Sequence, residues 1–168
     1  MADLLIRAET PEDVDAIRAL TTAAFEGQPF SDGGEAGIID RLRTEGDLAL
    51  SLVAELGGEI VGHVALSSVS VGEALEGWFG LGPISVAPVS QGQGHGAALM
   101  RAALAWLSER DAAGCVLVGD PGYYGRFGFR TDGTISYLDV PGQFVLKIVL
   151  SGPDARGEVR YAPAFGGA

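Results

Sequence analysis

The spacing of apolar residues predicts two helices in the N-terminal part of the chain. A short strand at residues 4–7 comes first, followed by Thr10, which can cap a helix, and Pro11, which suits the first helical position. The residues that then recur with the period of an amphipathic helix are Val14, Ile17, Thr21, Ala24 and Phe25. A loop at residues 26–34 leads to a short second helix that ends near Gly46.

The period changes to two in the centre of the chain, which is typical of strands. A strand is expected over residues 48–55, with its leucines on one face and with Ser51 and Glu55 on the other. The pair Gly57-Gly58 signals a hairpin turn into a long strand over residues 59–71.

Helices and strands alternate in the second half. After a turn around residues 72–77, a strand at residues 78–87 contains Gly80, Gly82 and Pro83, which indicate a bulge or a close backbone approach. The remaining elements are a glycine-rich loop at 91–96, a helix to about residue 110, a strand at 115–119, a short helix at 123–127 and a last strand at 144–150. This order predicts an α/β fold with a mixed sheet. One domain over residues 1–168 is expected, with a core of about 4–150 and a tail of 151–168.

The charge balance excludes one class of partner. The 168 residues carry 22 Asp and Glu against 11 Lys and Arg, for a formal net charge of −11. No cluster of Lys and Arg could neutralise a phosphate backbone, so nucleic acid is not an expected partner. The apolar runs are too short to span a membrane, and residues 1–10 do not resemble a signal peptide. A cytoplasmic protein without membrane contact is expected.

The thiol and imidazole groups predict no metal site. The one cysteine, Cys115, lies in an apolar run that favours a buried and inert thiol. Two histidines and one cysteine without ligand spacing do not form a metal-binding pattern.

The segment Gln91–Ala97 (QGQGHGA) joins a predicted strand to a predicted helix. Glycines allow bare amides to approach a ligand, and the positive end of a helix attracts an anion, so a pyrophosphate is the expected ligand. Two nucleotide-binding loop patterns fit this segment. Gly92-x-Gly94-x-x-Ala97 matches a dinucleotide loop, and Gln91-x-x-Gly94-x-Gly96 matches a coenzyme A loop. A purely structural turn is the third alternative.

The position of this loop in the chain favours coenzyme A. A dinucleotide fold opens with its glycine loop, whereas here three strands in antiparallel succession precede it. The acid expected about 20 residues after a dinucleotide loop is only poorly matched by Asp120.

Three motifs resemble the GNAT superfamily of N-acetyltransferases. They are Ile84-Ser85-Val86-Ala87-Pro88 at the end of the fourth strand, the Gln91-x-x-Gly94-x-Gly96 loop, and Tyr124-Gly125-Arg126-Phe127-Gly128-Phe129. The resemblance extends from Leu5 to about Leu150. The run from Gly119 to Phe129, with Val159-x-Tyr161-x-x-Ala164-Phe165, is similar to the YhbS-type branch of predicted bacterial acetyltransferases.

The resemblance implies a mostly antiparallel mixed sheet, splayed between strands 4 and 5 and flanked by about four helices. It implies acetyl-CoA as the acyl donor, with the pantetheine arm along the fourth strand and the pyrophosphate on the loop. The residues that the resemblance assigns to coenzyme binding are Ile84, Ser85, Val86, Gln91, Gly92, Gln93, Gly94, His95, Gly96 and Ala97. The side chain of His95 is expected to be an exposed spacer rather than a catalyst.

The resemblance further implies that Tyr124 is the general acid that protonates the departing thiolate. Packing of an aromatic core residue is the alternative for Tyr124 and the expectation for Tyr123. The fourth strand, at residues 78–87, contains no carboxylate, so a direct base is in doubt. The remaining candidates for the base are Glu76, Glu55, His63 and Asp120, of which His63 and Asp120 fit structural roles better.

The acceptor is expected to be an amine of a small molecule or peptide, attacking directly in a ternary complex. By resemblance its pocket lies near the loop between the first two helices. The residues offered there are Phe25, Glu26, Phe30, Asp32 and Glu35, with Trp78 and Phe79 opposite. Relatives that pair through their last strands suggest a homodimer. A non-catalytic acyl-CoA-binding module is the main alternative function, and a dinucleotide-binding oxidoreductase is the remote one.

Overall fold

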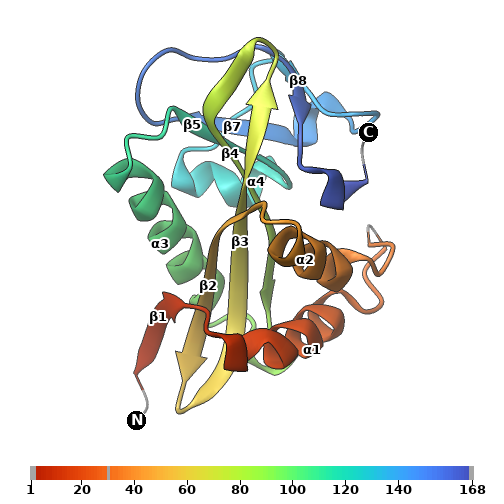
Figure 1. The fold of residues 1–168 in the computed structure, drawn as a ribbon, viewed down its shortest axis with the longest axis vertical. Coiled ribbons are helices and arrows are strands. Elements are labelled where there is room, and N and C mark those ends of the chain that lie inside the picture. The colour runs from red at the N-terminus through yellow and green to blue at the C-terminus, as the bar shows by residue number, and fades with distance from the viewer. Residues whose placement is uncertain (1–2, 30, 167–168) are drawn as a thin grey trace. The chain divides into compact units, whose positions relative to one another are not determined.

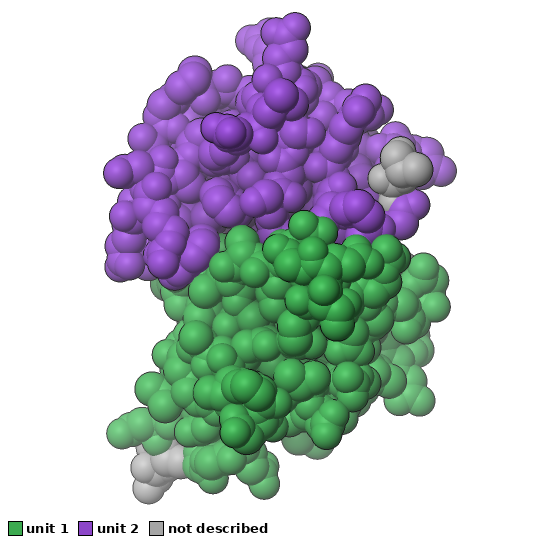
Figure 2. All heavy atoms as spheres, in the orientation of Figure 1, with its two compact units in different colours: residues 1–66, 82–103 green, residues 67–81, 104–168 purple. Residues whose placement is uncertain are grey.

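The computed structural model describes residues 3–29 and 31–166. Figure 2 shows the two compact units into which the chain divides. Unit 1 contains residues 1–66 and 82–103, and unit 2 contains residues 67–81 and 104–168, apart from those outside the described ranges.

The elements follow the predicted order, with two added strands (Figure 1). The helices are α1 (Val14–Phe25), α2 (Glu35–Thr44), α3 (His95–Glu109) and α4 (Pro121–Tyr124). The strands are β1 (Leu4–Ala8), β2 (Leu48–Leu56), β3 (Glu59–Val71), β4 (Ala74–Val86), β5 (Gly114–Val118), β6 (Ile135–Ser136), β7 (Val145–Val149) and β8 (Gly157–Arg160). Because β3, β4 and α3 each cross a unit boundary, they contribute residues to both units.

Strand pairing confirms the predicted mixed, mostly antiparallel sheet. The strands follow the order β1-β2-β3-β4-β5-β7, and β8 pairs with β3 and β6. The pairs β1–β2, β3–β8 and β5–β7 are antiparallel, whereas β4 and β5 run parallel, with Trp78–Gly80 opposite Gly114–Val116. The resemblance also predicts that β4 and β5 diverge beyond Gly80 and Val116. That divergence involves residues of different units, so it stays a prediction.

Two strand assignments from the sequence were wrong. β4 begins at Ala74, inside the predicted turn, because the chain reverses over Gly72 and Glu73 and a strand accommodates Gly77 at a φ of 85°. The segment expected to be a tail contains β8, which pairs with Ser70 and Val71 of β3. A strand of 4 residues is too short to show a hydrophobic period, so only its pairing reveals it.

In unit 1, β2 is buried on both faces. Val53 packs in a cluster with Ile17 of α1 and Ile39 of α2. On another side, a Cβ placed on Gly62 would lie 2.9 Å from Leu99 Cδ1 of α3 and 3.4 Å from the Cβ of Ala54. This burial explains why the expected polar face of β2 was wrong for Ser51, which is buried.

In unit 2, the core gathers around the parallel pair of strands. Trp78 of β4, Val116 of β5, Val145 of β7 and Val159 of β8 are buried in one cluster. The fully buried ammonium of Lys147 donates to Thr134 Oγ1 at 2.7 Å and to the carbonyl of Ala155 at 3.0 Å, and it pairs with Asp154 Oδ1 at 2.8 Å. These contacts join β7 to the segment that leads into β8.

Candidate active site

The glycine loop has the backbone geometry of an anion-binding turn. Gly92 and Gly94 adopt φ angles of 79° and 86°, a region that only glycine occupies without strain. Both are exposed, and a Cβ placed on either would meet nothing within 4 Å. The loop leads directly into α3, a helix of 15 residues, whose first amides and dipole favour an anion.

The end of β4 is tied to this loop within unit 1. Gln91 Nε2 donates to the carbonyl of Val86 at 3.1 Å. Ile84 and Val86 are half-buried, whereas the intervening Ser85 is buried, as strand alternation requires. Among residues 3–29 and 31–166, the Ser85 hydroxyl has no hydrogen-bond partner.

The prediction that the His95 side chain is exposed was wrong. His95 is 7% exposed, because α3 places it one turn before the fully buried Leu99 on the interior face of the helix. Neither ring nitrogen has a hydrogen-bond partner within the described part of the chain. His95 therefore packs as part of the interior of unit 1, and its backbone still begins α3.

Tyr124 lies at the end of α4 in unit 2. Asp120 caps this helix by accepting a hydrogen bond from the amide of Gly122 at 3.0 Å, so its expected capping role is confirmed. The Tyr124 ring lies against Gly119, where a Cβ would collide with it, and meets Phe129 edge-on at 6.4 Å between ring centroids. Burial, with the nearby Tyr123 and Asp120, raises the pKa of Tyr124 to about 12. The phenol is therefore neutral at pH 7.

Tyr123 makes the packing contacts expected of it. Its ring meets Tyr124 at 4.9 Å and Phe127 at 5.6 Å between centroids, and the Arg126 guanidinium lies 4.6 Å above it.

The candidates for the base hold different positions. Glu55 pairs with Arg7 at 2.9 Å. Glu76 is exposed on β4, so the expectation that the fourth strand holds no carboxylate was wrong, because this strand begins at Ala74. His63 is fully buried, with its Nε2 2.7 Å from Ser51 Oγ, which also bonds the Glu9 carboxylate. Burial lowers the pKa of His63 to about 4, so the ring is neutral at pH 7.

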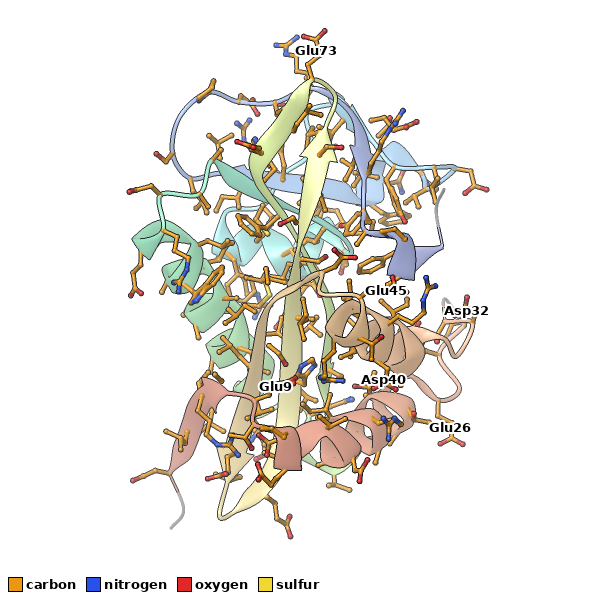
Figure 3. All side chains as sticks on the ribbon, viewed as in Figure 1. Glu9, Glu26, Asp32, Asp40, Glu45 and Glu73 are labelled. Carbon is orange, nitrogen blue, oxygen red and sulfur yellow. The ribbon has the colours of Figure 1, made fainter. Side chains whose placement is uncertain are left out.

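The cluster around His63 was not found from the sequence as a unit. Glu9 is held by Arg43 through hydrogen bonds of 2.8 and 2.9 Å, so a carboxylate, a hydroxyl and an imidazole follow one another inside unit 1. Glu9 is labelled in Figure 3. The members of this cluster lie on β2, β3, α2 and the segment before α1, and no local spacing connects them.

A cavity of about 620 Å³ lies where α1 ends and α2 begins. It is lined by Thr21, Thr22, Phe25, Glu26, Gly27, Gln28, Pro29, Ser31, Gly33, Glu35 and Ala36. Three of the residues expected at an acceptor pocket, Phe25, Glu26 and Glu35, are thus brought together.

The other described residues expected at that pocket are not among those that line the cavity. Asp32 Oδ1 accepts from the amide of Gly34 at 2.8 Å and is not part of the lining, while Phe30 lies outside the described residues. Trp78 was wrongly placed, because it is 2% exposed in the core of unit 2. Phe79 meets Trp106 edge-on at 6.2 Å.

The described residues contain no group of three or more His, Cys, Asp or Glu side chains that could hold a metal ion. No helix within the same ranges is both long and apolar enough to cross a membrane. Burial raises the pKa of the Cys115 thiol, as an inert thiol requires.

The fold is shared with known acetyltransferases. Residues 5–131 match the family described as Acetyltransferase (GNAT) domain. The chain is 41% identical over 129 residues to the uncharacterized N-acetyltransferase YhbS of Escherichia coli K12, covering 76% of this chain and 74% of that protein.

Two solved structures are similar over nearly the whole chain. A GNAT family acetyltransferase from Brucella melitensis in complex with acetyl-CoA has a TM-score of 0.86 and 42% identity, covering 97% of this chain and 98% of that one. YhbS from Escherichia coli in complex with CoA has a TM-score of 0.90 and 31% identity, covering 99% and 93%. The family match, the sequence identity and the structural similarity agree, and the chain belongs to the GNAT family of acetyltransferases.

Proposed function

We propose that this protein transfers an acetyl group from acetyl-CoA to an amine of a small molecule or peptide, by direct attack in a ternary complex. The observation that carries the proposal is the Gly92–Gly94 turn at the start of α3, whose exposed backbone fits a pyrophosphate. The acetyl-CoA and CoA complexes of the two similar proteins support the choice of donor.

The donor would be held chiefly by backbone groups. The amides of Gln91, Gly92, Gln93, Gly94, His95, Gly96 and Ala97 would receive the pyrophosphate, since they surround the start of α3. The backbone of β4 at Ile84, Ser85 and Val86 would bond the pantetheine arm like an added strand.

The transfer of the acetyl group needs one proton donor. The neutral amine nitrogen attacks the thioester carbonyl carbon, a C–N bond forms, and the C–S bond breaks with its electron pair on sulfur. We assign Tyr124 the role of protonating that thiolate, because it stands at the position that matches the family's general acid and a neutral phenol carries a proton that a thiolate can accept. The acetylated nitrogen loses its extra proton to solvent or to a base.

The proposal is tested by two measurements on the purified protein. Acetyl-CoA and CoA should raise its melting temperature, since a ligand that binds the folded state stabilises it, while NADH should not. Release of free thiol from acetyl-CoA should then rise when an amine library is added. Stabilisation without amine-dependent thiol release would favour the alternative, a non-catalytic acyl-CoA-binding module. The absence of stabilisation in a folded sample would reduce the loop to a structural turn.

A further inference from the structure

The 168 residues contain a single lysine. Of the 11 Lys and Arg residues, Lys147 is the lysine and the others are arginines. The exposed ion pairs of the described ranges therefore use guanidinium groups, as in the pairs of Arg18 with Asp40 and of Arg41 with Glu45. A guanidinium stays protonated in proteins, whereas the lysine amine is the group that acetylation modifies. Because Lys147 is 0% exposed, the folded surface offers an acetyl donor no lysine to react with.

The ammonium of Lys147 is enclosed by acceptors in unit 2. It has three N–H donors, and three acceptors surround it: Thr134 Oγ1 at 2.7 Å, Asp154 Oδ1 at 2.8 Å and the carbonyl of Ala155 at 3.0 Å. A second carboxylate, that of Asp132, has its Oδ2 3.6 Å from Nζ and accepts the hydroxyl hydrogen of Thr134. The donors of Lys147 are thus all used inside the protein.

The backbone closes the same place. The amide and the carbonyl of Lys147 on β7 both pair with Arg130, each at 2.9 Å. Thr134 directly precedes β6, and Asp154 lies on the segment that leads into β8. To expose Nζ, the segments that carry these three partners must separate from β7. Local opening of this kind has a free-energy cost, and only the open fraction of the molecules can react.

We propose that Lys147 is a cryptic acetylation site, which acetyl-CoA cannot reach in the folded protein and modifies when this part of unit 2 opens. Only the identity of the donor rests on the proposed function. In the open segment the neutral Nζ attacks the thioester carbonyl carbon, a C–N bond forms, and the C–S bond breaks with its electron pair on sulfur. The nitrogen loses one proton and the CoA thiolate gains one, so the products are acetyl-lysine and CoA.

The modified side chain cannot take back the place of the ammonium. An amide nitrogen keeps one N–H, so two of the three acceptors around Lys147 lose their donor, and Asp154 loses its cation. Buried polar atoms without partners are unfavourable, and the added acetyl group has to fit where the side chain is 0% exposed. Acetylation therefore holds the segment open.

The test compares two lysines in one protein. Arg160→Lys adds a lysine on β8, where the arginine side chain is 77% exposed and pairs with Glu158. The folded variant is treated with acetyl-CoA and, separately, with the N-hydroxysuccinimide ester of acetic acid, which needs no binding site. Mass spectrometry follows each lysine after cleavage at arginine, because residues 131–156 then form one peptide that contains Lys147.

In the folded protein Lys147 should react about 100-fold or more slowly than the introduced lysine, and in denaturant the two rates should be similar. Equal rates in the folded protein would overturn the proposal. Protection that persists in denaturant would overturn it as well, since it would not come from the fold.

A variant tests the contact that closes the site. Asp154→Asn keeps the size of the side chain and removes its charge, so it should speed the acetylation of Lys147 about tenfold by easing the opening. Glu158→Gln removes a carboxylate of the same unit that pairs with Arg160, and it is the matched control, which should leave the rate unchanged. An unchanged rate in Asp154→Asn would contradict this role of the ion pair.

Refolding tests the second half of the proposal. Protein acetylated in denaturant should not regain the near-ultraviolet circular dichroism of the core around Trp78 when the denaturant is removed. The Arg160→Lys variant, acetylated while folded and then unfolded, is the control and should regain it. Recovery of the native signal by protein acetylated at Lys147 would sink the claim that the modified segment stays open.

The two proposals fail separately. Protection of Lys147 from the ester, in a protein that does not bind acetyl-CoA, would support the cryptic site and sink the proposed donor. Transfer of acetyl groups to added amines, in a protein whose folded Lys147 reacts freely, would sink the cryptic site and leave the acetyltransferase proposal standing.

Discussion

The two units carry candidate functional segments that differ in construction. In unit 1 the glycine loop exposes backbone around Gly92 and Gly94, and their freedom to adopt positive φ angles is what the sequence has to supply. In unit 2 the Tyr124 segment presents one side chain, packed against Gly119 and Phe129. A backbone site should tolerate many side-chain changes and fail when a glycine is replaced. A side-chain site should fail when one atom is removed.

Two buried basic side chains, one in each unit, differ in the groups that surround them. In unit 1 His63 has a hydroxyl beside it and is kept neutral by burial. In unit 2 the equally buried Lys147 has two hydrogen-bond acceptors and the carboxylate of Asp154. Burial favours the neutral form of a basic group, and anionic and carbonyl oxygens around the group oppose that effect.

The largest expected effect is that of Tyr124→Phe, which removes one oxygen and keeps the ring. If the phenol protonates the thiolate, kcat should fall by about 100-fold or more, with little change in acetyl-CoA affinity. Steady-state kinetics with calorimetry of coenzyme binding checks this. Tyr123→Phe is the matched control and should keep its kcat; an unaltered kcat in Tyr124→Phe would remove Tyr124 as the acid.

Gly94→Val should weaken acetyl-CoA binding by roughly 10- to 100-fold. A β-branched residue is strained at a φ of 86°, so the turn must change and the amides leave their places. Gly46→Val is the control, since Gly46 also has a positive φ, of 79°, with open space around it, but lies after α2. Similar loss of stability in both variants, with loss of binding in Gly94→Val alone, is the expected result. Equal binding in both would contradict the loop assignment.

The neutral His63 predicts a stability that falls in mild acid. Its pKa is near 6.5 when unfolded and about 4 when folded, so the unfolded chain binds more protons between these values. The contribution of the neutral His63 to the free energy of unfolding is fully present above pH 6.5 and is lost progressively as the pH falls toward 4. About 2 kcal/mol of it is lost from pH 7.5 to pH 5.

Denaturant unfolding across this range measures the loss, and His63→Gln should flatten it. Protonation of Asp13 also destabilises the folded protein in acid. Because hydrogen bonds from Arg7 lower the pKa of Asp13 to about 2, this loss of stability falls mostly at lower pH. A slope that His63→Gln does not change would assign the loss to other groups.

The smallest expected effect is a gain. Thr21→Val keeps the shape of the side chain and removes a buried hydroxyl without a described partner, so it should stabilise the free protein by about 1 kcal/mol. Thermal unfolding measures this gain, and Thr22→Val is the control, because it removes a hydroxyl that has a hydrogen bond.

Much of the fold follows from local patterns. The hairpin at Gly57-Gly58, the cap at Asp120 and the glycine turn before α3 depend on residues a few positions apart, and each was predicted. These features could be read because backbone conformation and capping are decided by near neighbours in the chain.

Burial and side-chain partners depended on the tertiary structure. The burial of His95, the core position of Trp78 and the strand β8 were each missed, because each depends on which distant segment packs against it. The cluster of Glu9, Ser51 and His63 joins residues up to 54 positions apart, as the difference of their numbers shows. The sequence by itself determined the family, the order of elements and the glycine turn. The tertiary structure decided which polar groups lose water and which partners they meet, since desolvation is a property of the packed interior.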